Sequence, residues 1–328
     1  MKATLHDVAA RAEVSIATAS RALNGLPVSK TNLVRVRRAA ADLGYVANEA
    51  ARSLRSDRTL TIGLIFPRLR AHAGLELLDA MAGAVEDRGY SLMVSTARGD
   101  GERYDLLMRR FLERRVDALI CVHPTGSGEM LDAYKAAETP VLAVFDRPGA
   151  FKRLPVVLPS LRSAASDLAK SLVALGHQRI ALLSRPERIG PISAVCSALK
   201  KQGVTLDRLR YGPDPREVRE LLRGLLARRE PPTAIVTYYR AAVQLMSACR
   251  ELRIEVPEQL SIVSISDHTA ESFPARKPFS ALVVEPDPLG RAAGNAVLAW
   301  LEGQAPPAET SVEAGTWVER ATTANAAR

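Results

Sequence analysis

Residues 4–24 read Thr4-Leu-His-Asp-Val-Ala-Ala-Arg-Ala-Glu-Val-Ser-Ile-Ala-Thr-Ala-Ser-Arg-Ala-Leu-Asn24. Thr4 is a good N-cap for a first helix, because Asp7 stands where a capping box needs an acidic side chain. Ser15 predicts the cap of a second helix that runs to about Leu23, and the Asn-Gly pair at 24–25 favours its end. Two short helices joined by a tight turn predict a helix-turn-helix unit, whose second helix would enter the DNA major groove.

The same end of the chain is strongly basic. The first 58 residues contain ten lysines and arginines but only five acidic residues, whereas the whole chain of 328 residues has a net charge of +9. Concentrated positive charge is typical of a surface that binds the phosphate backbone. Capped helix pairs also occur in all-α domains without a nucleic-acid partner. The charge favours double-stranded DNA as the partner.

A third helix is expected over roughly residues 30–43. Ser29 is a plausible N-cap, and the apolar side of the helix would come from Val34, Val36, Ala40 and Leu43. Three helices then complete a small DNA-binding domain over residues 1–47.

The amino-acid composition indicates the class of protein and its compartment. With 47% hydrophobic and 25% charged residues, the chain is typical of a globular protein of two or three domains. It has no apolar run approaching ~20 residues and no signal-peptide pattern, which predicts a cytoplasmic, nucleoid-associated protein without a membrane span. Three widely spaced cysteines indicate neither a disulfide framework nor a zinc site.

Catalytic motifs are missing from the sequence. There is no Gly-x-x-x-x-Gly-Lys, no Gly-x-Gly-x-x-Gly after a strand and no Gly-x-Ser-x-Gly. None of the five histidines has a neighbour at metal-binding spacing. His177 suits a structural role in a helix-to-strand turn, and His123 ends a strand where a polar lining role is as plausible as chemistry. The sequence therefore predicts no enzyme, no metal and no cofactor.

From Leu60 onward, apolar runs alternate with helical patterns. Strands are expected at 60–66, 90–95, 116–122 and 140–145, and again at 179–184, 233–238, 260–265 and 280–284. Helices are expected near 73–88, 103–115, 128–138, 189–202, 215–229, 240–252 and 289–301. Such alternation predicts α/β lobes with doubly wound parallel sheets, and two sets predict two lobes. Ligands bind such sheets at the carboxyl ends of their strands.

Several motifs in this order resemble the lactose-repressor (LacI/GalR) family of transcription regulators. The N-terminal motifs are Thr4-Leu5-x-Asp7-Val8-Ala9, Val14-Ser15-x-x-Thr18-x-Ser20-Arg21-x-Leu23-Asn24, Leu43-Gly44-Tyr45, Asn48-x-x-Ala51-Arg52-Ser53-Leu54 and Ile62-Gly63-Leu64-Ile65. Later motifs are Leu175-Gly176-His177-Gln178-Arg179-Ile180-Ala181 and Val256-Pro257-Glu258-x-Leu260-Ser261. The resemblance implies an all-α helix-turn-helix domain followed by a two-lobed type I periplasmic-binding-protein-like domain.

The resemblance also implies the domain boundaries. Residues 1–47 would bind DNA, 48–58 would form a hinge helix, and 59–328 would form the two-lobed effector-binding and dimerisation domain. The first lobe would comprise about 59–158 and 285–308, and the second about 159–284 and 309–328. The chain would cross between lobes near 159, near 285 and within 305–310, and the tail 322–328 would be frayed.

The resemblance assigns roles to individual DNA-contacting residues. Those implied to read bases are Ile16, Ala17 and Arg21. Those implied to contact the DNA backbone are Thr4, Thr18, Ser20 and Asn24. In the hinge, Leu54 matches a leucine that wedges into the minor groove, with Ala51 one turn earlier. Glu13 departs from the family, which usually has glycine at this turn, and a non-glycine residue at positive φ would cost roughly 1–2 kcal/mol.

The effector cleft departs more strongly from the family pattern. Positions that usually clamp sugar hydroxyls carry Ser160, Leu161, Pro191, Ala194, Val195, Tyr239, Arg240 and Ser266. Asp146 is the one polar residue of the pattern that is clearly retained. A plain neutral sugar is therefore not the expected effector. Two alternatives stay open. The cleft could bind an anion through Arg68, Arg70, Arg188 or Arg240, or an aromatic compound on Tyr239, or the effector response could be absent.

The sequence thus predicts a homodimeric, sequence-specific transcriptional regulator, a repressor that binds a pseudopalindromic operator. One rival is an architectural DNA-binding protein that bends DNA without responding to an effector. A second rival is a solute-binding protein of the same two-lobed fold, which the basic N-terminal end disfavours.

Overall fold

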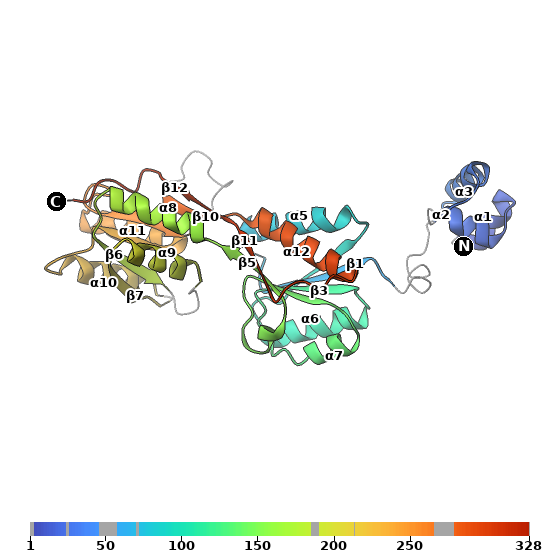
Figure 1. Ribbon diagram of the computed structural model, residues 1–328, viewed down its shortest axis with the longest axis horizontal. Helices are drawn as coiled ribbons and strands as arrows, with labels where there is room; N and C mark the ends of the chain where they lie inside the picture. Colours follow the sequence, from blue (N-terminus) through green and yellow to red (C-terminus); the bar gives the residue numbers. More distant parts are fainter. Residues whose placement is uncertain are drawn as a thin grey trace. The chain divides into compact units, whose positions relative to one another are not determined.

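The computed structural model describes most of the chain (Figure 1). The described residues are 3–23, 26–45, 58–69, 72–184, 190–212, 214–265 and 279–327. The chain divides into two compact units, Met1–Leu60 and Thr61–Arg328. Within the described ranges, every helix is too short or too polar to cross a membrane.

The described residues of the first unit form three helices. They are α1 (Leu5–Ala12), α2 (Ile16–Leu23) and α3 (Lys30–Asp42). Alanines make up most of the core, because small side chains let short helices approach closely. The buried side chains are Val8, Ala9, Ala12, Ala19, Ala22, Val36, Ala39 and Ala40. This core is small, so little apolar burial stabilises the unit.

Two residues expected in this core are exposed instead. Val34 exposes 66% of its surface and Leu43 exposes 37%. Leu33 packs against the core, on the same face of α3 as Val36 and Ala40. These three residues are three or four positions apart and therefore share one helix face, which leaves Val34 on another face.

The second unit contains two six-stranded sheets. The first sheet has the strand order β11-β5-β4-β3-β1-β2, and all its neighbouring strands are parallel. Its strands are β1 (Thr61–Phe66), β2 (Ser91–Thr96), β3 (Ala118–Val122), β4 (Val141–Val144), β5 (Val156–Ser160) and β11 (Glu309–Glu313). Its helices are α5 (His72–Glu86), α6 (Gly101–Glu113), α7 (Leu131–Ala136), the 3₁₀ helix η1 (Gly149–Arg153) and α12 (Pro286–Leu301).

Helices α5 and α12 lie side by side over one face of this first sheet, and α6 and α7 lie over the other (Figure 1). The close approach of α12 to α5 depends on two glycines. A Cβ atom at Gly290 would lie 2.7 Å from the carbonyl oxygen of Leu77, and one at Gly294 would lie 2.8 Å from Cβ of Ala84. Since no side chain fits at these positions, the two helices pack backbone against backbone.

The second sheet has the strand order β12-β10-β9-β8-β6-β7 and is parallel except for β12, which is antiparallel to β10. Its strands are β6 (Arg179–Ser184), β7 (Thr205–Arg210), β8 (Ala234–Tyr238), β9 (Ser261–Ile265), β10 (Ser280–Val284) and β12 (Gly315–Val318). One face packs on α8 (Arg162–Ala174) and α9 (Gly190–Lys201), and the other on α10 (Pro215–Leu226) and α11 (Tyr239–Leu252).

The third crossing between the lobes lies further along the chain than the sequence predicted. Strand β11 pairs in parallel with β5, from Glu309 with Val156 to Glu313 with Ser160. Residues 309–313 therefore belong to the first lobe, not the second, and the chain crosses at Ala314. The three crossing segments are hydrogen-bonded together, because Ala314 N–H donates to Ser160 O (3.1 Å) and Glu285 N–H donates to Ala314 O (2.9 Å).

The described part of the C-terminal tail, residues 322–327, packs on the second lobe, although its small polar residues predict fraying. Thr322 exposes 3% and Thr323 exposes 9% of their surfaces. The N–H of Ile262 donates to Thr322 O at 2.8 Å, and the N–H of Ala326 donates to Leu175 O at 2.7 Å. The tail residues form hydrogen bonds with backbone groups of the second lobe, so they can be buried although they are polar.

The predicted alternation of strands and helices is confirmed, but it omits six of the described elements. These are β5, β7, β11, β12, α8 and η1. The strand β7 has the polar sequence Thr-Leu-Asp-Arg-Leu-Arg and lies at the edge of its sheet, where only one neighbour pairs with it. Edge strands need no continuous apolar run, which explains why the sequence pattern does not reveal β7.

Candidate nucleic-acid interface

Helices α1 and α2 each begin at an N-cap, Thr4 for α1 and Ser15 for α2. Thr4 N–H and Oγ1 donate to Oδ2 of Asp7 at 2.8 and 2.7 Å, and Asp7 N–H donates to Thr4 Oγ1 at 3.3 Å. The hydrogen bonds from Thr4 hold the pKa of Asp7 below its ordinary value. Ser15 Oγ accepts from the N–H of Thr18 at 3.1 Å. Both caps are those that the sequence predicts.

Glu13 adopts the left-handed conformation that usually requires glycine. Its φ is 48° and its ψ is 47°, and its N–H donates to the carbonyl oxygens of Ala9 and Ala10. The left-handed backbone therefore ends α1 and turns the chain toward α2. The carboxylate of Glu13 forms an ion pair with Arg35 of α3. Because both side chains are largely exposed, this ion pair compensates little of the backbone strain.

Replacing Glu13 by glycine is expected to stabilise the first unit by about 1 kcal/mol, because glycine adopts positive φ without strain. The readout is amide hydrogen exchange at Val8 and Ala12 in the full chain, which reports the free energy of opening. Glu13→Gln is the matched control: it removes the ion pair and keeps the strain, so exchange should be equal or slightly faster. Faster exchange in Glu13→Gly than in Glu13→Gln would contradict the expectation.

The outward face of α2 carries the three residues expected to read bases. Ile16, Ala17 and Arg21 are all exposed, and Ile16 has 42% of its surface accessible to solvent. The opposite face holds Ala19 and Ala22, which are buried in the core of the unit. An apolar side chain that a small core leaves exposed is available for packing against DNA, for example against thymine methyl groups. Arg21 forms no ion pair within the described part of the chain.

The residues expected to contact the DNA backbone differ in their surroundings. Thr4 and Thr18 lie at the starts of α1 and α2, and the hydroxyl of Thr18 is 2.9 Å from that of Ser15. Both hydroxyls are therefore fixed by local hydrogen bonds. Ser20 is partly buried on α2. Asn24 lies outside the described residues, as do Ala51 and Leu54 of the expected hinge.

The other two helices of the first unit also carry exposed arginines. Arg11 on α1 and Arg37 and Arg38 on α3 are exposed, and none of them pairs with an acidic group among the described residues. Unpaired arginines at a surface raise the local potential and attract a polyanion. The first unit therefore combines an exposed helix face with free cations, as a DNA-binding module requires.

The positions of the expected effector site divide between the two sheets. Arg68, Asp146 and Ser160 follow or end strands of the first sheet. Pro191 lies at the start of α9, and Tyr239 and Arg240 begin α11 directly after β8. Arg70, Arg188 and Ser266 lie outside the described residues. Tyr239 is partly buried, and its ring packs edge-on against Phe279 with the centroids 5.8 Å apart.

At the carboxyl ends of two neighbouring strands of the first sheet, His123, Phe145 and Asp146 form a cluster. Nδ1 of His123, after β3, lies 2.8 Å from Oδ1 of Asp146, after β4. The imidazole stacks on the ring of Phe145 with the centroids 4.4 Å apart. His123 and Phe145 both have positive φ, 42° and 77°. Strain of this kind persists where surrounding structure enforces it, and it clusters at functional sites.

This cluster changes the interpretation of Asp146. From the sequence, Asp146 is expected to bind a sugar hydroxyl, and His123 is expected to line the site independently of Asp146. Their pairing was missed because the two residues are 23 positions apart. The available signal was that each follows a buried strand, since parallel strands bring their carboxyl ends to one edge. One carboxylate oxygen of Asp146 is already bonded to His123 and is less available to a hydroxyl group.

Comparison with known proteins assigns the chain to a family. It matches the bacterial regulatory proteins of the lacI family over residues 4–48 and the periplasmic binding protein-like domain over residues 169–323. The lactose operon repressor of Escherichia coli (strain K12) is 30% identical over 315 residues, which cover 92% of this chain and 86% of that repressor. The maltose regulon regulatory protein MalI of the same strain is 30% identical over 250 residues, 72% of each chain.

A solved structure extends the similarity to three dimensions. The lac repressor dimer bound to operator and the anti-inducer ONPF matches with a TM-score of 0.82 at 25% identity, covering 99% of this chain and 100% of that chain. One conclusion follows from the capped helix pair, the exposed face of α2, the two mainly parallel sheets and these relatives. The chain belongs to the LacI family and is a DNA-binding transcriptional regulator.

Proposed function

We propose that this regulator is a homodimeric repressor that binds a pseudopalindromic operator through α2 of each subunit. The observation that carries the proposal is the exposed face formed by Ile16, Ala17 and Arg21. A two-fold dimer presents two such faces to two half-sites of opposite orientation. The similar lac repressor structure is a dimer bound to operator, which supports this assembly.

Within each half-site, Ile16 and Ala17 select bases by packing and Arg21 by hydrogen bonding. Neither Ile16 nor Ala17 can donate or accept a side-chain hydrogen bond, so both favour thymine methyl groups. Arg21 can donate two parallel hydrogen bonds to a guanine. Phosphate contacts, which fix the register without reading sequence, are assigned to Thr4, Thr18, Ser20 and Asn24.

The division of labour along the chain is also part of the proposal. Residues 1–47 read DNA, 48–58 form a hinge in which Ala51 and Leu54 enter the minor groove, and the two lobes from 59 onward dimerise. The protein acts on DNA in the cytoplasm, at the nucleoid, and works by binding without catalysis. The LacI motifs over residues 4–48 and the similarity of the whole chain to the lac repressor support this division.

Substituting Arg21 by alanine is expected to weaken binding to the specific operator by about 1–3 kcal/mol and to change non-specific binding little. The control is Arg38→Ala, which removes an exposed cation of α3 and should weaken binding to both DNAs by similar factors. Fluorescence anisotropy with an operator duplex and a scrambled duplex measures both effects. Equal losses for Arg21→Ala on the two duplexes would assign Arg21 to phosphate and refute its role as a base reader.

We further propose that any effector of this repressor is not a plain neutral sugar. Asp146 is bonded to His123. The other clamp positions among the described residues carry Ser160, Leu161, Pro191, Ala194, Val195, Tyr239 and Arg240. Sugar hydroxyls need matched donors and acceptors, and each unmatched buried polar group costs about 1–3 kcal/mol. An anionic or aromatic effector suits the arginines and rings at these positions better.

A panel of hexoses, pentoses and nucleosides is therefore expected to leave both operator binding and the melting temperature unchanged. A true ligand at a hundredfold excess over its Kd would add about 2.7 kcal/mol of stability, which thermal denaturation detects readily. Organic acids and sugar phosphates form the comparison panel. Stabilisation by a neutral sugar together with operator release would refute this assignment. If only organic acids or sugar phosphates stabilise the protein and release the operator, that response should be lost in Arg68→Gln or Arg240→Gln.

A further inference from the structure

Strand β7 forms the outer edge of the second sheet. Among the described strands, β6 is its one neighbour. Thr205 N–H donates to Gln178 O at 2.9 Å, and Tyr211 N–H donates to Ser184 O at 3.2 Å. Because the backbone groups of alternate residues point to the same side of a strand, those of residues 205, 207 and 209 face β6. The N–H and C=O groups of residues 206, 208 and 210 therefore point outward, where a further strand could pair with them.

The two faces of β7 differ in charge. Leu206 packs with the apolar cluster that includes α8 and α9, whereas Leu209 packs with the cluster that includes α10 and α11. Since side chains alternate along a strand, Arg208 and Arg210 lie on the same face as Leu206. Both arginines are exposed, and neither pairs with an acidic group of the described residues. The face of β7 toward α9 therefore presents two free cations.

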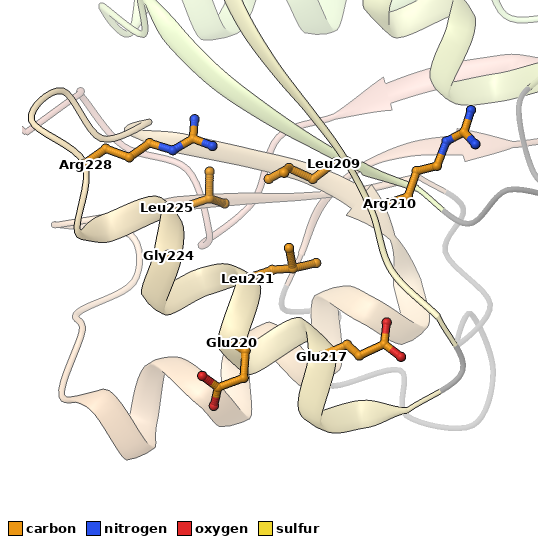
Figure 2. Close-up of a pocket in the computed structure, with 8 residues that line it drawn as sticks. All are labelled: Leu209, Arg210, Glu217, Glu220, Leu221, Gly224, Leu225 and Arg228. Atoms are coloured by element: carbon orange, nitrogen blue, oxygen red, sulfur yellow. The ribbon is translucent and has the colours of Figure 1, made fainter.

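The other face of this edge opens into a pocket of about 420 Å³ between β7 and α10 (Figure 2). The apolar part of its lining comes from Leu209, Leu221 and Leu225. Figure 2 shows the side chain of Arg210 directed away from these leucines. The remaining lining residues are Glu217, Glu220, Gly224 and Arg228. None of them belongs to the DNA-binding face or to the expected effector positions.

The pocket suits an apolar side chain. Arg228 pairs with Asp207 at 2.6 Å, and Oε2 of Glu217 accepts from the N–H of Gly212 at 2.5 Å. These charged groups therefore already have partners. A Cβ atom at Gly224 would meet no atom within 4 Å, so the missing side chain leaves space open beside the leucines. An apolar side chain that enters this space removes apolar surface from water, which favours binding.

We propose that β7 binds an extended segment of a partner protein in which acidic and apolar residues alternate. The segment adds a strand to the sheet, and its backbone forms hydrogen bonds with the outward groups of residues 206, 208 and 210. Its acidic side chains lie beside Arg208 and Arg210, because residues opposite each other in neighbouring strands share a face. The apolar side chain between them lies beside Leu209 and enters the pocket.

A second copy of this chain fits the edge poorly. Pairing β7 with β7 of another copy would place the arginines of the two strands on one face, and like charges opposite each other destabilise a strand pair. Charged side chains at a sheet edge also hinder aggregation. If Arg208 and Arg210 had that role alone, no acidic peptide would bind.

The test is titration of the full-length protein with the synthetic peptide acetyl-Thr-Glu-Leu-Glu-Leu-Glu-Thr-amide, followed by residue-resolved hydrogen exchange. Binding should slow exchange at the N–H groups of residues 206, 208 and 210, which gain partners. The N–H groups of residues 207 and 209 already face β6 and should change little. One control peptide has the order Thr-Leu-Leu-Glu-Glu-Glu-Thr, and another has lysine in place of glutamate. Both should bind at least about tenfold more weakly.

Three variants localise the binding. Arg208→Gln combined with Arg210→Gln should weaken the peptide about five- to tenfold. Gly224→Leu fills the pocket and should weaken it at least about tenfold, while the higher helix propensity of leucine keeps α10 folded. Arg250→Gln removes an exposed arginine of α11 and is the matched control, which should bind as the parent does.

Three results would overturn the proposal. The first is a peptide that does not saturate the protein up to about 10 mM. The second is binding that leaves exchange at residues 208 and 210 unchanged, because the peptide would then not pair with β7. The third is slower exchange at these residues on raising the protein concentration without peptide, which would make the occupant a second copy of the chain.

Discussion

The affinity of this regulator for its DNA site is expected to fall by about 10³–10⁵-fold when salt rises from about 50 to about 200 mM. A protein that neutralises phosphates releases condensed counterions, so the binding constant depends steeply on salt. The first unit of each subunit contains more basic than acidic residues. Among its described cations, Arg11, Arg37 and Arg38 are exposed, and none of the three pairs with an acidic group of the described residues. Two copies on one operator would supply on the order of 6–10 phosphate contacts.

Anisotropy titrations over a series of salt concentrations measure the slope of log affinity against log salt. Removing one phosphate contact from each subunit, with Arg37→Gln, should reduce the slope by about two for a dimer. Arg109→Gln removes an exposed arginine from α6 in the second unit and should leave the slope unchanged. An affinity that does not change over this salt range would contradict DNA binding through the basic unit.

Replacing Gly290 by leucine is expected to destabilise the first lobe by about 3 kcal/mol. A Cβ atom there would lie 2.7 Å from both Leu77 O and Ala80 Cβ, and 3.2 Å from the backbone N of Met81. Backbone atoms cannot rotate away as a flexible side chain can, so α12 would have to move off α5. That movement would also expose apolar surface along the whole contact between the helices.

Urea denaturation of the full-length protein checks this value, with the second lobe as an internal reference. Gly83→Ala is the matched control, because Gly83 lies on α5 and a Cβ there would meet no atom within 4 Å. That substitution should raise stability by about 0.5–1 kcal/mol through helix propensity alone. Unchanged stability in Gly290→Leu would show that the close packing of α5 on α12 does not support the lobe.

Local chemistry made much of the fold predictable. Thr4 and Ser15 fit their caps because a capping side chain acts within three residues of its own position. Glu13 was expected to stand at a glycine position, and its backbone is indeed left-handed. The buried central strands were recognisable because strands covered on both faces form continuous apolar runs. These signals depend on the neighbouring residues and not on the final packing.

Elements that depend on distant partners were harder to predict. Strand β11 has a weak pattern of its own and is defined by pairing with β5, about 150 residues earlier. The tail looks polar, but Thr322 is buried because it satisfies backbone groups of β9. Val34 was placed in the core by hydrophobicity, whereas the helix register exposes it. Pairing of His123 with Asp146 likewise follows from the strand order and not from local sequence.

The most direct measurement of the central claim is selection of binding sites from random double-stranded DNA by the full-length protein. If α2 of two symmetric subunits reads base edges, the enriched sequences should contain two inverted half-sites, each with a guanine opposite Arg21 and thymines near Ile16 and Ala17. The same selection with Arg21→Ala should lose the preference for that guanine and keep the half-site symmetry. Enrichment of no common motif, or of one unaffected by Arg21→Ala, would contradict sequence reading by α2.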